Sequence, residues 1–196
     1  MTHIKKITLF LCLLTLAACT TTQRQMDNAA WRMQRQKLEN VSNWTISGKL
    51  AIITSEKKGS ARIRWQQHGD NYDLNLTSIL GTRIMEMHKD GDKILIIDDR
   101  GRQYAGADAD QLVYRLTGWQ MPVSRLPIWI KGLPGDSRDY AISKQGQLTS
   151  INAGDWKMDY QSYQDVSGWM MPEKVNFTGP KTTLKLSINE WEFVSQ

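Results

Sequence analysis

The chain has 196 residues, and its 25 Lys and Arg residues against 20 Asp and Glu residues give a formal net charge of +5 at pH 7. With 40% hydrophobic residues, the chain is long enough and apolar enough to bury a sizeable core. The charge excess is mild and no basic block is present, which excludes the clustered cations typical of nucleic-acid binding. We therefore expect no nucleic-acid partner.

The N-terminal segment has the regions of a secretory signal peptide in their usual order. Lys5 and Lys6 precede an apolar run over residues 7–16, and the run ends in Leu16-Ala17-Ala18-Cys19. The run is about ten residues long, whereas a stable transmembrane span needs roughly 20. A cysteine after small residues, with Leu three positions before it, is typical of a bacterial lipoprotein. An ordinary cleaved signal with an incidental cysteine is the alternative.

The lipoprotein interpretation divides the chain into three parts. Residues 1–18 are the signal peptide, residues 19–28 are a lipidated flexible tether attached through Cys19, and residues 29–196 form a single domain. Cleavage removes Cys12, so the mature chain has no disulfide, and the loss of Lys5 and Lys6 lowers the net charge from +5 to +3. Thr20 stands where an Asp would retain a lipoprotein in the inner membrane. We therefore expect a lipid-anchored protein on the periplasmic face of the outer membrane.

The first half of the domain alternates between apolar and polar residues. A weak helical stripe from Asp27 to Val41 predicts one helix, with Asp27 as its N-cap. Residues 46–53 and 61–67 have period two, as strands with one covered face do, and further strands are expected at 74–76, 82–87 and 94–97. These strands are separated by four polar turns: Lys57-Lys58-Gly59, His68-Gly69-Asp70, Lys89-Asp90-Gly91-Asp92 and Asp98-Asp99-Arg100-Gly101.

The second half predicts two helices and then more strands. Residues 108–116 and 123–131 have helical patterns that end at Gly118 and at Gly132-Leu133-Pro134. Strands resume at 140–143, 148–151, 156–160, 174–177 and 183–193. About ten strands so close along the chain must be antiparallel, and they exceed what one flat sheet usually holds. We therefore expect a mainly β fold, a single antiparallel sheet curled into an unclosed half-barrel, with a few helices covering its concave side.

Residues with catalytic or metal-binding chemistry are few. Of the three histidines, His3 is removed with the signal, and no pair has metal-ligand spacing; no nucleophile motif or phosphate loop is present. Turn and N-cap roles explain four aspartates better than a calcium site does, because no EF-hand spacing follows them: Asp98, Asp99, Asp108 and Asp110. We expect no catalytic residue, no metal and no cofactor, although the carboxylate pair of an envelope hydrolase stays open as an alternative.

Large apolar side chains are in excess, with eight tryptophans and nine methionines. Plain core filling is one interpretation. A curled sheet under a lid, however, encloses more volume than its own side chains fill, and Trp and Met suit lipid-like ligands of varying shape. The sequence therefore predicts an acyl-chain cavity, with these candidate lining residues: Trp31, Leu50, Ile52, Ile63, Trp65, Leu74, Leu76, Trp129, Trp156, Met158 and Trp191.

The turn over residues 77–82 is unusual, because Ile79 and Leu80 lie at its centre where polar residues are the rule. Two interpretations are open. The two side chains either fold back onto the core, or they stay exposed and touch acyl chains or a bilayer.

Several short segments in a fixed order resemble the LolB family of outer-membrane lipoprotein receptors. They are Leu80-Gly81-Thr82, Asp98–Tyr104, Leu116-Thr117-Gly118, Trp129–Gly135 with Asp139-Tyr140, and the strand Leu184–Trp191. The resemblance covers essentially the whole mature chain and implies an unclosed β-barrel with a helical lid. It also implies a function: the protein accepts lipoproteins from the periplasmic carrier LolA and inserts them into the inner leaflet of the outer membrane.

The resemblance also assigns roles to residues. It places the lipid attachment at Cys19 and the membrane-insertion loop at Ile79, Leu80 and Gly81, with Leu80 as the inserting leucine. The family often has Asn-Pro before this Leu-Gly, where the present chain has Ser78-Ile79. The implied partners are LolA, the acyl chains of client lipoproteins and the outer-membrane bilayer. We expect a monomer without enzymatic activity. A structural or scaffolding lipoprotein, with a filled core that binds a protein partner, is the alternative.

We expect contact with the carrier to be partly electrostatic, because the mature chain is net basic. A simply solvated basic surface is the alternative. The candidate residues for a positive rim are Arg32, Arg35, Lys37, Lys49, Arg62 and Arg64.

Overall fold

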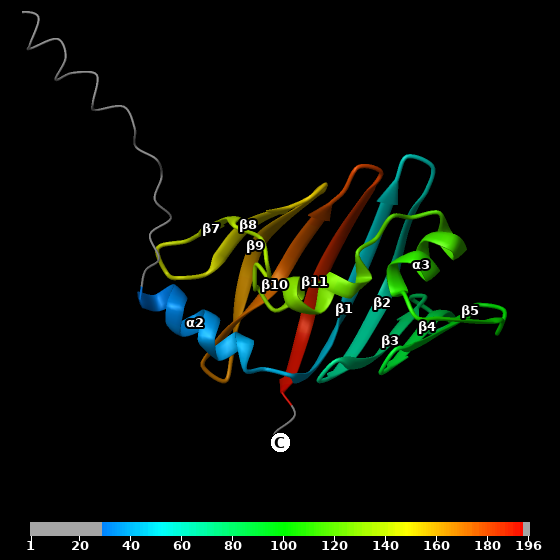
Figure 1. Cartoon of the computed structure of the whole chain (residues 1–196), viewed down its shortest axis with the longest axis horizontal. Helices are drawn as coiled ribbons and strands as arrows, with labels where there is room; N and C mark the ends of the chain where they lie inside the picture. The colour runs from blue at the N-terminus through cyan, green and yellow to red at the C-terminus, as the bar shows by residue number, and fades with distance from the viewer. Residues whose placement is uncertain (1–28, 194–196) are drawn as a thin grey trace, which may run out of the picture.

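A single antiparallel sheet of eleven strands dominates residues 29–193, the part of the chain that the computed structural model describes. The strand order is β6-β5-β4-β3-β2-β1-β11-β10-β9-β8-β7, so the first and last strands meet in the middle of the sheet. The edge strands β6 and β7 do not pair with each other, and helices lie over one face (Figure 1). The predicted half-barrel is thereby confirmed. Residues 1–18, Cys19 and the proposed tether lie outside the described residues.

In the strand order, one half of the sheet consists of β1 (Asn43–Thr54), β2 (Lys58–His68), β3 (Asn71–Thr77), β4 (Arg83–Asp90), β5 (Lys93–Asp98) and β6 (Gln103–Gly106). The other half consists of β7 (Asp139–Ile142), β8 (Leu148–Ala153), β9 (Trp156–Val166), β10 (Trp169–Thr178) and β11 (Thr182–Phe193). The helices are α2 (Ala29–Glu39), α3 (Ala109–Thr117), the 3-10 helix η2 (Val123–Arg125) and α4 (Leu126–Ile130). Among the described residues, no helix is long and apolar enough to cross a membrane.

Alternation of side chains gives the sheet its two faces. In β3 the side chains of Tyr72, Leu74 and Leu76 are buried, while the residues between them are half-exposed. The same period holds in β2 and β11. Because successive strand residues point to opposite faces, this pattern places one apolar face of the sheet under the helices and leaves the other wet.

Irregularities in two long strands accompany the curl of the sheet. The β1–β11 register shifts between Ser47 and Gly48, where a Cβ on Gly48 would lie 2.1 Å from the carbonyl oxygen of Ser187, so only glycine fits. The β9–β10 register shifts beside Pro172, whose missing N–H is tolerated at such a bulge. Bulges bend a strand and increase its local twist. The same bulge lets β10 begin at Trp169, five residues before the predicted strand.

The helices over the sheet begin and end largely where the sequence predicts. Asp108 caps α3 by accepting a hydrogen bond from the backbone N–H of Gln111 (3.0 Å), and Gly118 follows the last turn. Residues 123–131, predicted as one helix, form a 3-10 turn followed by α4, because Pro127 lies in the first turn of α4 and cannot donate a backbone hydrogen bond. The four-residue edge strand β6 was not predicted.

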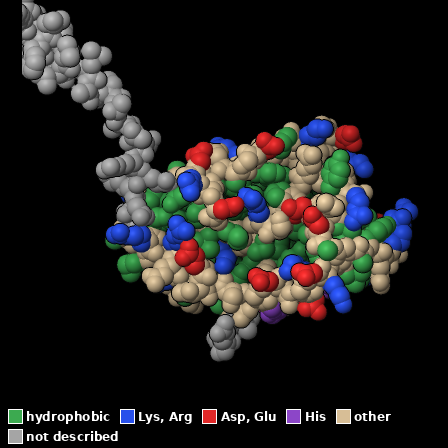
Figure 2. All heavy atoms as spheres, viewed as in Figure 1, with side chains coloured by type: hydrophobic (Ala, Val, Ile, Leu, Met, Phe, Trp, Pro, Cys, Tyr) green, Lys and Arg blue, Asp and Glu red, His purple; other side chains and the backbone are tan. Residues whose placement is uncertain are grey.

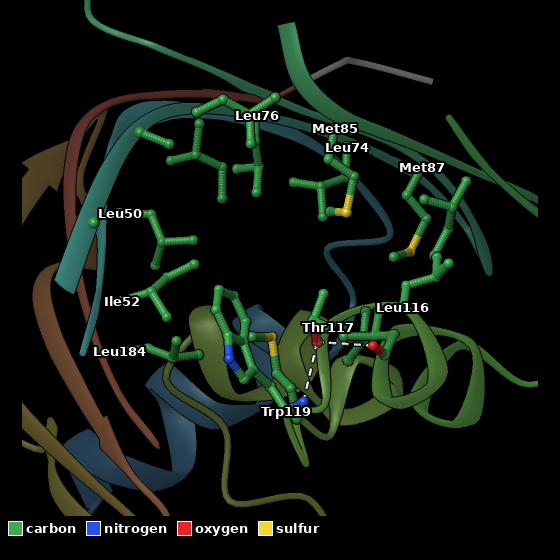
Figure 3. Close-up of a pocket in the computed structure, with 18 of the residues that line it drawn as sticks. Leu50, Ile52, Leu74, Leu76, Met85, Met87, Leu116, Thr117, Trp119 and Leu184 are labelled. Atoms are coloured by element: carbon green, nitrogen blue, oxygen red, sulfur yellow. Dashed lines mark hydrogen bonds between the residues drawn. The ribbon is translucent and has the colours of Figure 1, made fainter. Parts of the chain in front are cut away.

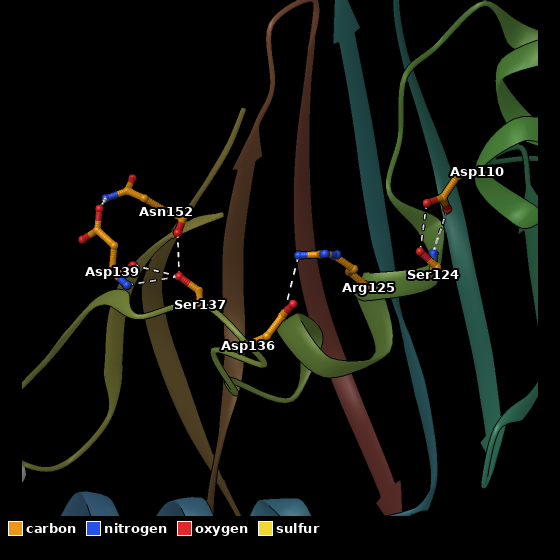
Figure 4. Close-up of polar contacts among 7 residues, drawn as sticks. All are labelled: Asp110, Ser124, Arg125, Asp136, Ser137, Asp139 and Asn152. Carbon is orange, nitrogen blue, oxygen red and sulfur yellow. Dashed lines mark hydrogen bonds and ion pairs between the residues drawn. The ribbon is translucent and has the colours of Figure 1, made fainter. Parts of the chain in front are cut away.

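Polar contacts hold this helical segment across the sheet (Figure 4). The carboxylate of Asp110 accepts hydrogen bonds from the backbone N–H (2.9 Å) and hydroxyl (2.8 Å) of Ser124, which ties α3 to η2. Arg125 lies 3.5 Å from Asp136, beyond α4. The hydroxyl of Ser137 then donates to the carbonyl oxygen of Asn152 on β8 (2.6 Å). The segment is therefore fixed from α3 to the edge of the sheet.

The buried Tyr72 and Tyr160 and the half-buried Tyr163 make the stability of the fold decrease at alkaline pH. The hydroxyl of Tyr160 donates to the carbonyl oxygen of Trp129 (2.6 Å), and that of Tyr163 donates to the carbonyl oxygen of Leu148 (2.8 Å). Burial raises the pKa of Tyr160, Tyr163 and Tyr72 above the ordinary value near 10. Above pH 10 the unfolded chain releases these protons while the folded chain keeps them, so stability falls as pH rises, by about 1.4 kcal/mol per pH unit for each tyrosine.

Urea unfolding between pH 8 and pH 11 measures this dependence. We expect Tyr160→Phe to be less stable at pH 8, because it loses a buried hydrogen bond, but to show a shallower decline above pH 10. Tyr114→Phe is the matched control, since the side chain of Tyr114 is exposed. An unchanged slope in Tyr160→Phe would contradict the assignment.

Candidate functional site

An apolar cavity of about 480 Å³ lies between the concave face of the sheet and the helical segment. Figure 3 shows its three walls. The first comes from β1 and β11, the second from β3 and β4, and the third from the end of α3 and the loop after it. The labelled lining residues are Leu50, Ile52 and Leu184 in the first wall, Leu74, Leu76, Met85 and Met87 in the second, and Leu116, Thr117 and Trp119 in the third.

The hydroxyl group of Thr117, in the third wall, already has hydrogen-bond partners within the protein. The hydroxyl of Thr117 donates to the carbonyl oxygen of Val113 (2.8 Å) and accepts from the backbone N–H of Trp119 (3.1 Å). The charged lining residues lie in the β1–β2 and β5–β6 turns or at the strand ends that border them: Lys57, Lys58, Asp98, Asp99 and Arg102. The cavity is thus apolar along its length and charged at one end, an arrangement that suits a ligand with an apolar chain and a polar head.

Methionines give part of the wall an adaptable shape. Met85, Met87 and Met121 line the cavity, and the sulfur of Met87 accepts a hydrogen bond from the hydroxyl of Tyr72 (3.2 Å). Unbranched thioether side chains repack easily around ligands of different shape. The volume lies within the range of roughly 300–1,000 Å³ that is usual for small-ligand sites.

The structure brings together six of the eleven predicted cavity residues. These six line the cavity: Leu50, Ile52, Ile63, Trp65, Leu74 and Leu76. The other five are buried but do not line it: Trp31, Trp129, Trp156, Met158 and Trp191.

The contacts of these five explain the difference. The indole N–H of Trp191 donates to the carbonyl oxygen of Pro172 (2.9 Å), and its ring lies 5.5 Å from that of Trp44. Trp31 packs against Tyr140 with ring centroids 5.8 Å apart. Trp156 fills the space beside Gly179. These side chains pack the part of the core beneath β7–β11 and α2. Alternation predicts which face a residue occupies, but not which half of that face.

The sequence interpretation missed the contribution of the helical segment and its loop. Val113, Leu116 and Trp119 line the cavity, as do Met121 and Ile130. The apolar stripe of α3 was a usable signal. Trp119 and Met121 lie between helices, where no periodicity indicates a direction.

The β3–β4 turn projects its apolar residues into solvent. Leu80 is 94% exposed and Ile79 is 68% exposed. The turn is closed by backbone hydrogen bonds from Ser78 to Thr82 (2.8 Å) and from Gly81 to Ser78 (3.0 Å), and Gly81 has φ +86°, which favours glycine. The sequence left two interpretations of this turn open, and the structure has the one in which both side chains are exposed. Ile84, which follows in β4 and is 40% exposed, lines the cavity.

The six basic residues predicted as a rim do not surround the cavity. On α2, Arg35 pairs with Glu39 (2.7 Å) and Lys37 lies over the ring of Trp169. Arg64 on β2 lies 3.9 Å from Glu192, and Lys49 is opposite Arg62 on the wet face of the sheet. None of the six lines the cavity, so they do not form the positive rim that was predicted.

Three of the four aspartates have structural roles in turns and caps. The carboxylate of Asp98 accepts from the backbone N–H groups of Arg100 and Arg102 (both 2.9 Å), while Asp108 caps α3 and Asp110 binds Ser124. Among residues 29–193, no group of three or more potential ligands could hold a metal ion.

Comparisons with known proteins agree on one family. A family model described as "Outer membrane lipoprotein LolB" matches residues 42–191. The outer-membrane lipoprotein LolB of Tolumonas auensis is 64% identical over 189 residues, 96% of this chain and 97% of that protein. The corresponding protein of Aeromonas salmonicida is 47% identical over 191 residues, 97% of this chain and 98% of that protein.

Solved structures show the fold alone. A LolA superfamily protein from Nitrosomonas europaea has a TM-score of 0.55 at 7% identity and covers 86% of this chain and 96% of its own. A putative outer membrane lipoprotein-sorting protein domain from Vibrio parahaemolyticus has a TM-score of 0.55 at 8% identity, with 84% and 91% covered.

Trp119 offers a direct test of the cavity. Its ring lines the space but lies in a loop, so we expect Trp119→Ala to weaken binding of a fluorescent fatty acid by about tenfold and to change stability little. Fluorescence titration and thermal melting measure the two effects. Trp169→Ala is the control, because Trp169 packs at a tilt against Phe193 and does not line the cavity. Equal losses in both variants would contradict this site.

Proposed function

The chain belongs to the LolB family of outer-membrane lipoproteins, and we propose that it takes lipoproteins from the periplasmic carrier LolA into its cavity and inserts them into the inner leaflet of the outer membrane. The cavity is the observation that supports this function most directly. Its walls are apolar and its adaptable methionines suit acyl chains. The anchor that we propose, acyl groups on Cys19, would keep the receptor at the membrane it serves.

Burial of acyl chains provides the driving force of each transfer. A methylene group removed from water contributes about 0.8 kcal/mol, so a whole chain has ample affinity for any apolar cavity. Passage from carrier to receptor to bilayer without an energy source requires the receptor to hold the chain more tightly than the carrier and less tightly than the membrane. An open-ended cavity with a shape-tolerant wall suits such an intermediate affinity.

The alternative of a scaffolding lipoprotein with a filled core is less well supported. A space of about 480 Å³ remains between the sheet and its helices, and a core evolved for packing alone leaves few voids larger than a water molecule. We propose a binding and transfer protein rather than an enzyme.

The exposed tip of the β3–β4 turn is the proposed insertion device. Ile79 and Leu80 protrude from the turn that precedes β4, and the exposed Ile84 near the start of β4 lines the cavity, so one short segment carries both the tip and part of the cavity wall. One leucine side chain buried in lipid contributes roughly 1.5–3 kcal/mol. That is enough to hold the tip transiently in a bilayer and too little to anchor the protein there.

A transfer assay tests the function as a whole. The chain without residues 1–18 and with Cys19→Ala is mixed with lipoprotein-loaded LolA, and the location of the lipoprotein is followed by gel filtration. We expect the lipoprotein to move to the receptor. If it stays on the carrier under conditions in which the receptor is folded, the proposed function fails.

Leu80→Glu separates acceptance from insertion. Because Leu80 is 94% exposed, we expect the melting temperature and acceptance from LolA to change little, while delivery to liposomes falls at least tenfold. Met33→Glu is the matched control, since Met33 is an exposed apolar residue on α2. Normal delivery by Leu80→Glu would exclude the insertion role of this residue.

A further inference from the structure

We propose that the three turns at the charged end of the cavity form a recognition surface for anionic phospholipid headgroups, which seats the Ile79-Leu80 tip on the bilayer. The inference rests on the proposed function and adds to it the chemistry of the membrane that the receptor recognises. It uses residues that neither the acyl-chain cavity nor the tip itself explains.

Strand pairing places the three turns at the same edge of the sheet. The β1–β2, β3–β4 and β5–β6 hairpins are neighbours in an antiparallel sheet, so their turns all lie at one end. Lys57 and Lys58 from the first turn and Asp98, Asp99 and Arg102 from the third line the same cavity. The β3–β4 tip lies between these two turns in strand order. Charged groups therefore flank the apolar tip and the cavity end together.

The uncompensated charge of this surface is mainly positive. Arg102 pairs with Asp98 (2.7 Å), and Arg83 pairs with Glu86 (3.6 Å). Three cations are exposed and, within residues 29–193, have no ion pair: Lys57, Lys58 and Arg100. Against them stand two exposed carboxylates of the same turns, those of Glu56 and Asp99.

Arg83 adds a further donor. Its Nε is buried and has no hydrogen-bond partner within the described residues, while its side chain is 40% exposed. The guanidinium also lies close to the third turn, since a Cβ on Gly101 would be 3.7 Å from an Arg83 terminal nitrogen. The exposed part of this guanidinium, three residues after Leu80 in the sequence, is suited to a phosphate oxygen.

The opposite end of the sheet has the opposite charge. The β2–β3 and β4–β5 turns carry Asp70, Asp90 and Asp92 against Lys89 and Lys93. Lys89 is partly engaged, because it donates to the carbonyl oxygen of Asp70 (2.9 Å). Figure 2 shows basic side chains gathered at the end of the molecule where Figure 1 labels β5. A protein with this asymmetry approaches an anionic surface with its tip first.

The combination of groups favours a bilayer over a protein partner. Surfaces that bind membranes place cations beside an apolar residue that enters the acyl region, so that phosphates and chains are contacted together. Here Leu80 is 94% exposed, and its turn lies in strand order between the turn that carries Lys57 and Lys58 and the turn that carries Arg100. An acidic patch on a carrier would neutralise the cations but would have to supply a separate apolar pocket for the tip.

Vesicle binding by the empty protein tests the proposal without carrier or lipoprotein. The chain beginning at residue 19 with Cys19→Ala keeps every strand and helix described above. It is co-sedimented with vesicles of phosphatidylethanolamine alone, or with part of it replaced by phosphatidylglycerol. We expect tighter, salt-sensitive binding to the vesicles that contain phosphatidylglycerol. The affinity for vesicles that contain phosphatidylglycerol should fall at least tenfold in Lys57→Glu/Lys58→Glu and about fivefold in Arg100→Glu. The affinity of both variants for phosphatidylethanolamine vesicles should not change.

The control reverses the same number of charges elsewhere. Lys93→Glu/Lys174→Glu alters exposed lysines at the opposite turn and on the wet face of β10, and should bind as the unaltered protein does. Equal losses in control and test variants, or no preference for phosphatidylglycerol, would overturn the proposal. Because Arg100 does not line the cavity, the Arg100→Glu variant should take up lipoprotein from LolA normally. Loss of that uptake with normal vesicle binding would assign the surface to the carrier instead.

Discussion

An unfilled apolar space between the sheet and its helical lid is the constraint on which the rest of this structure depends. Every side chain that faces a void loses dispersion contacts, so a cavity is a cost that the remaining interactions must offset. The hydrogen bonds that hold the lid in place accordingly lie around the space. Asp110 holds Ser124, and Ser137 reaches the backbone of Asn152 at the sheet edge. The lid is fixed by its polar margin, and the apolar walls stay available to a ligand.

The two halves of the sheet differ in how completely their concave face is packed. Beneath β7–β11, aromatic side chains fill the interior and hydrogen-bond to backbone carbonyls, as Trp191 does to Pro172 and Tyr160 does to Trp129. The open space lies beneath β1–β5 and the adjoining parts of β10 and β11, and most of its lining from these strands is leucine, isoleucine and methionine, with Trp65 and Phe177. The second of these bonds joins β9 directly to α4, so the packed half anchors the lid that the open half requires. Stability and binding thus come from different parts of one continuous sheet.

The parts of this arrangement that depend on local chemistry were predictable from the sequence. The alternation in β3, the cap at Asp108 and the glycine after α3 are each decided within a few residues. The position of Trp191 or Trp129 relative to the cavity depends on how the sheet curls, which no short pattern encodes. The direction of Leu80 left two interpretations for the same reason. Pro172 shows the limit most clearly, because a proline that argues against a strand is accommodated by a bulge in a long one.

Lys131 shows how the lid is also connected to the start of the domain. Its ammonium group donates to the carbonyl oxygens of Leu38 (3.2 Å) and Val41 (2.7 Å), at and just after the C-terminal end of α2. Burial lowers the pKa of this lysine, and the nearby Glu39 opposes the change. A cation at a helix C-terminus interacts favourably with the unpaired carbonyls there. Because Lys131 follows α4 directly, one side chain joins the cavity wall to α2, the first helix of the described residues, so a shift of α2 would also move the lid.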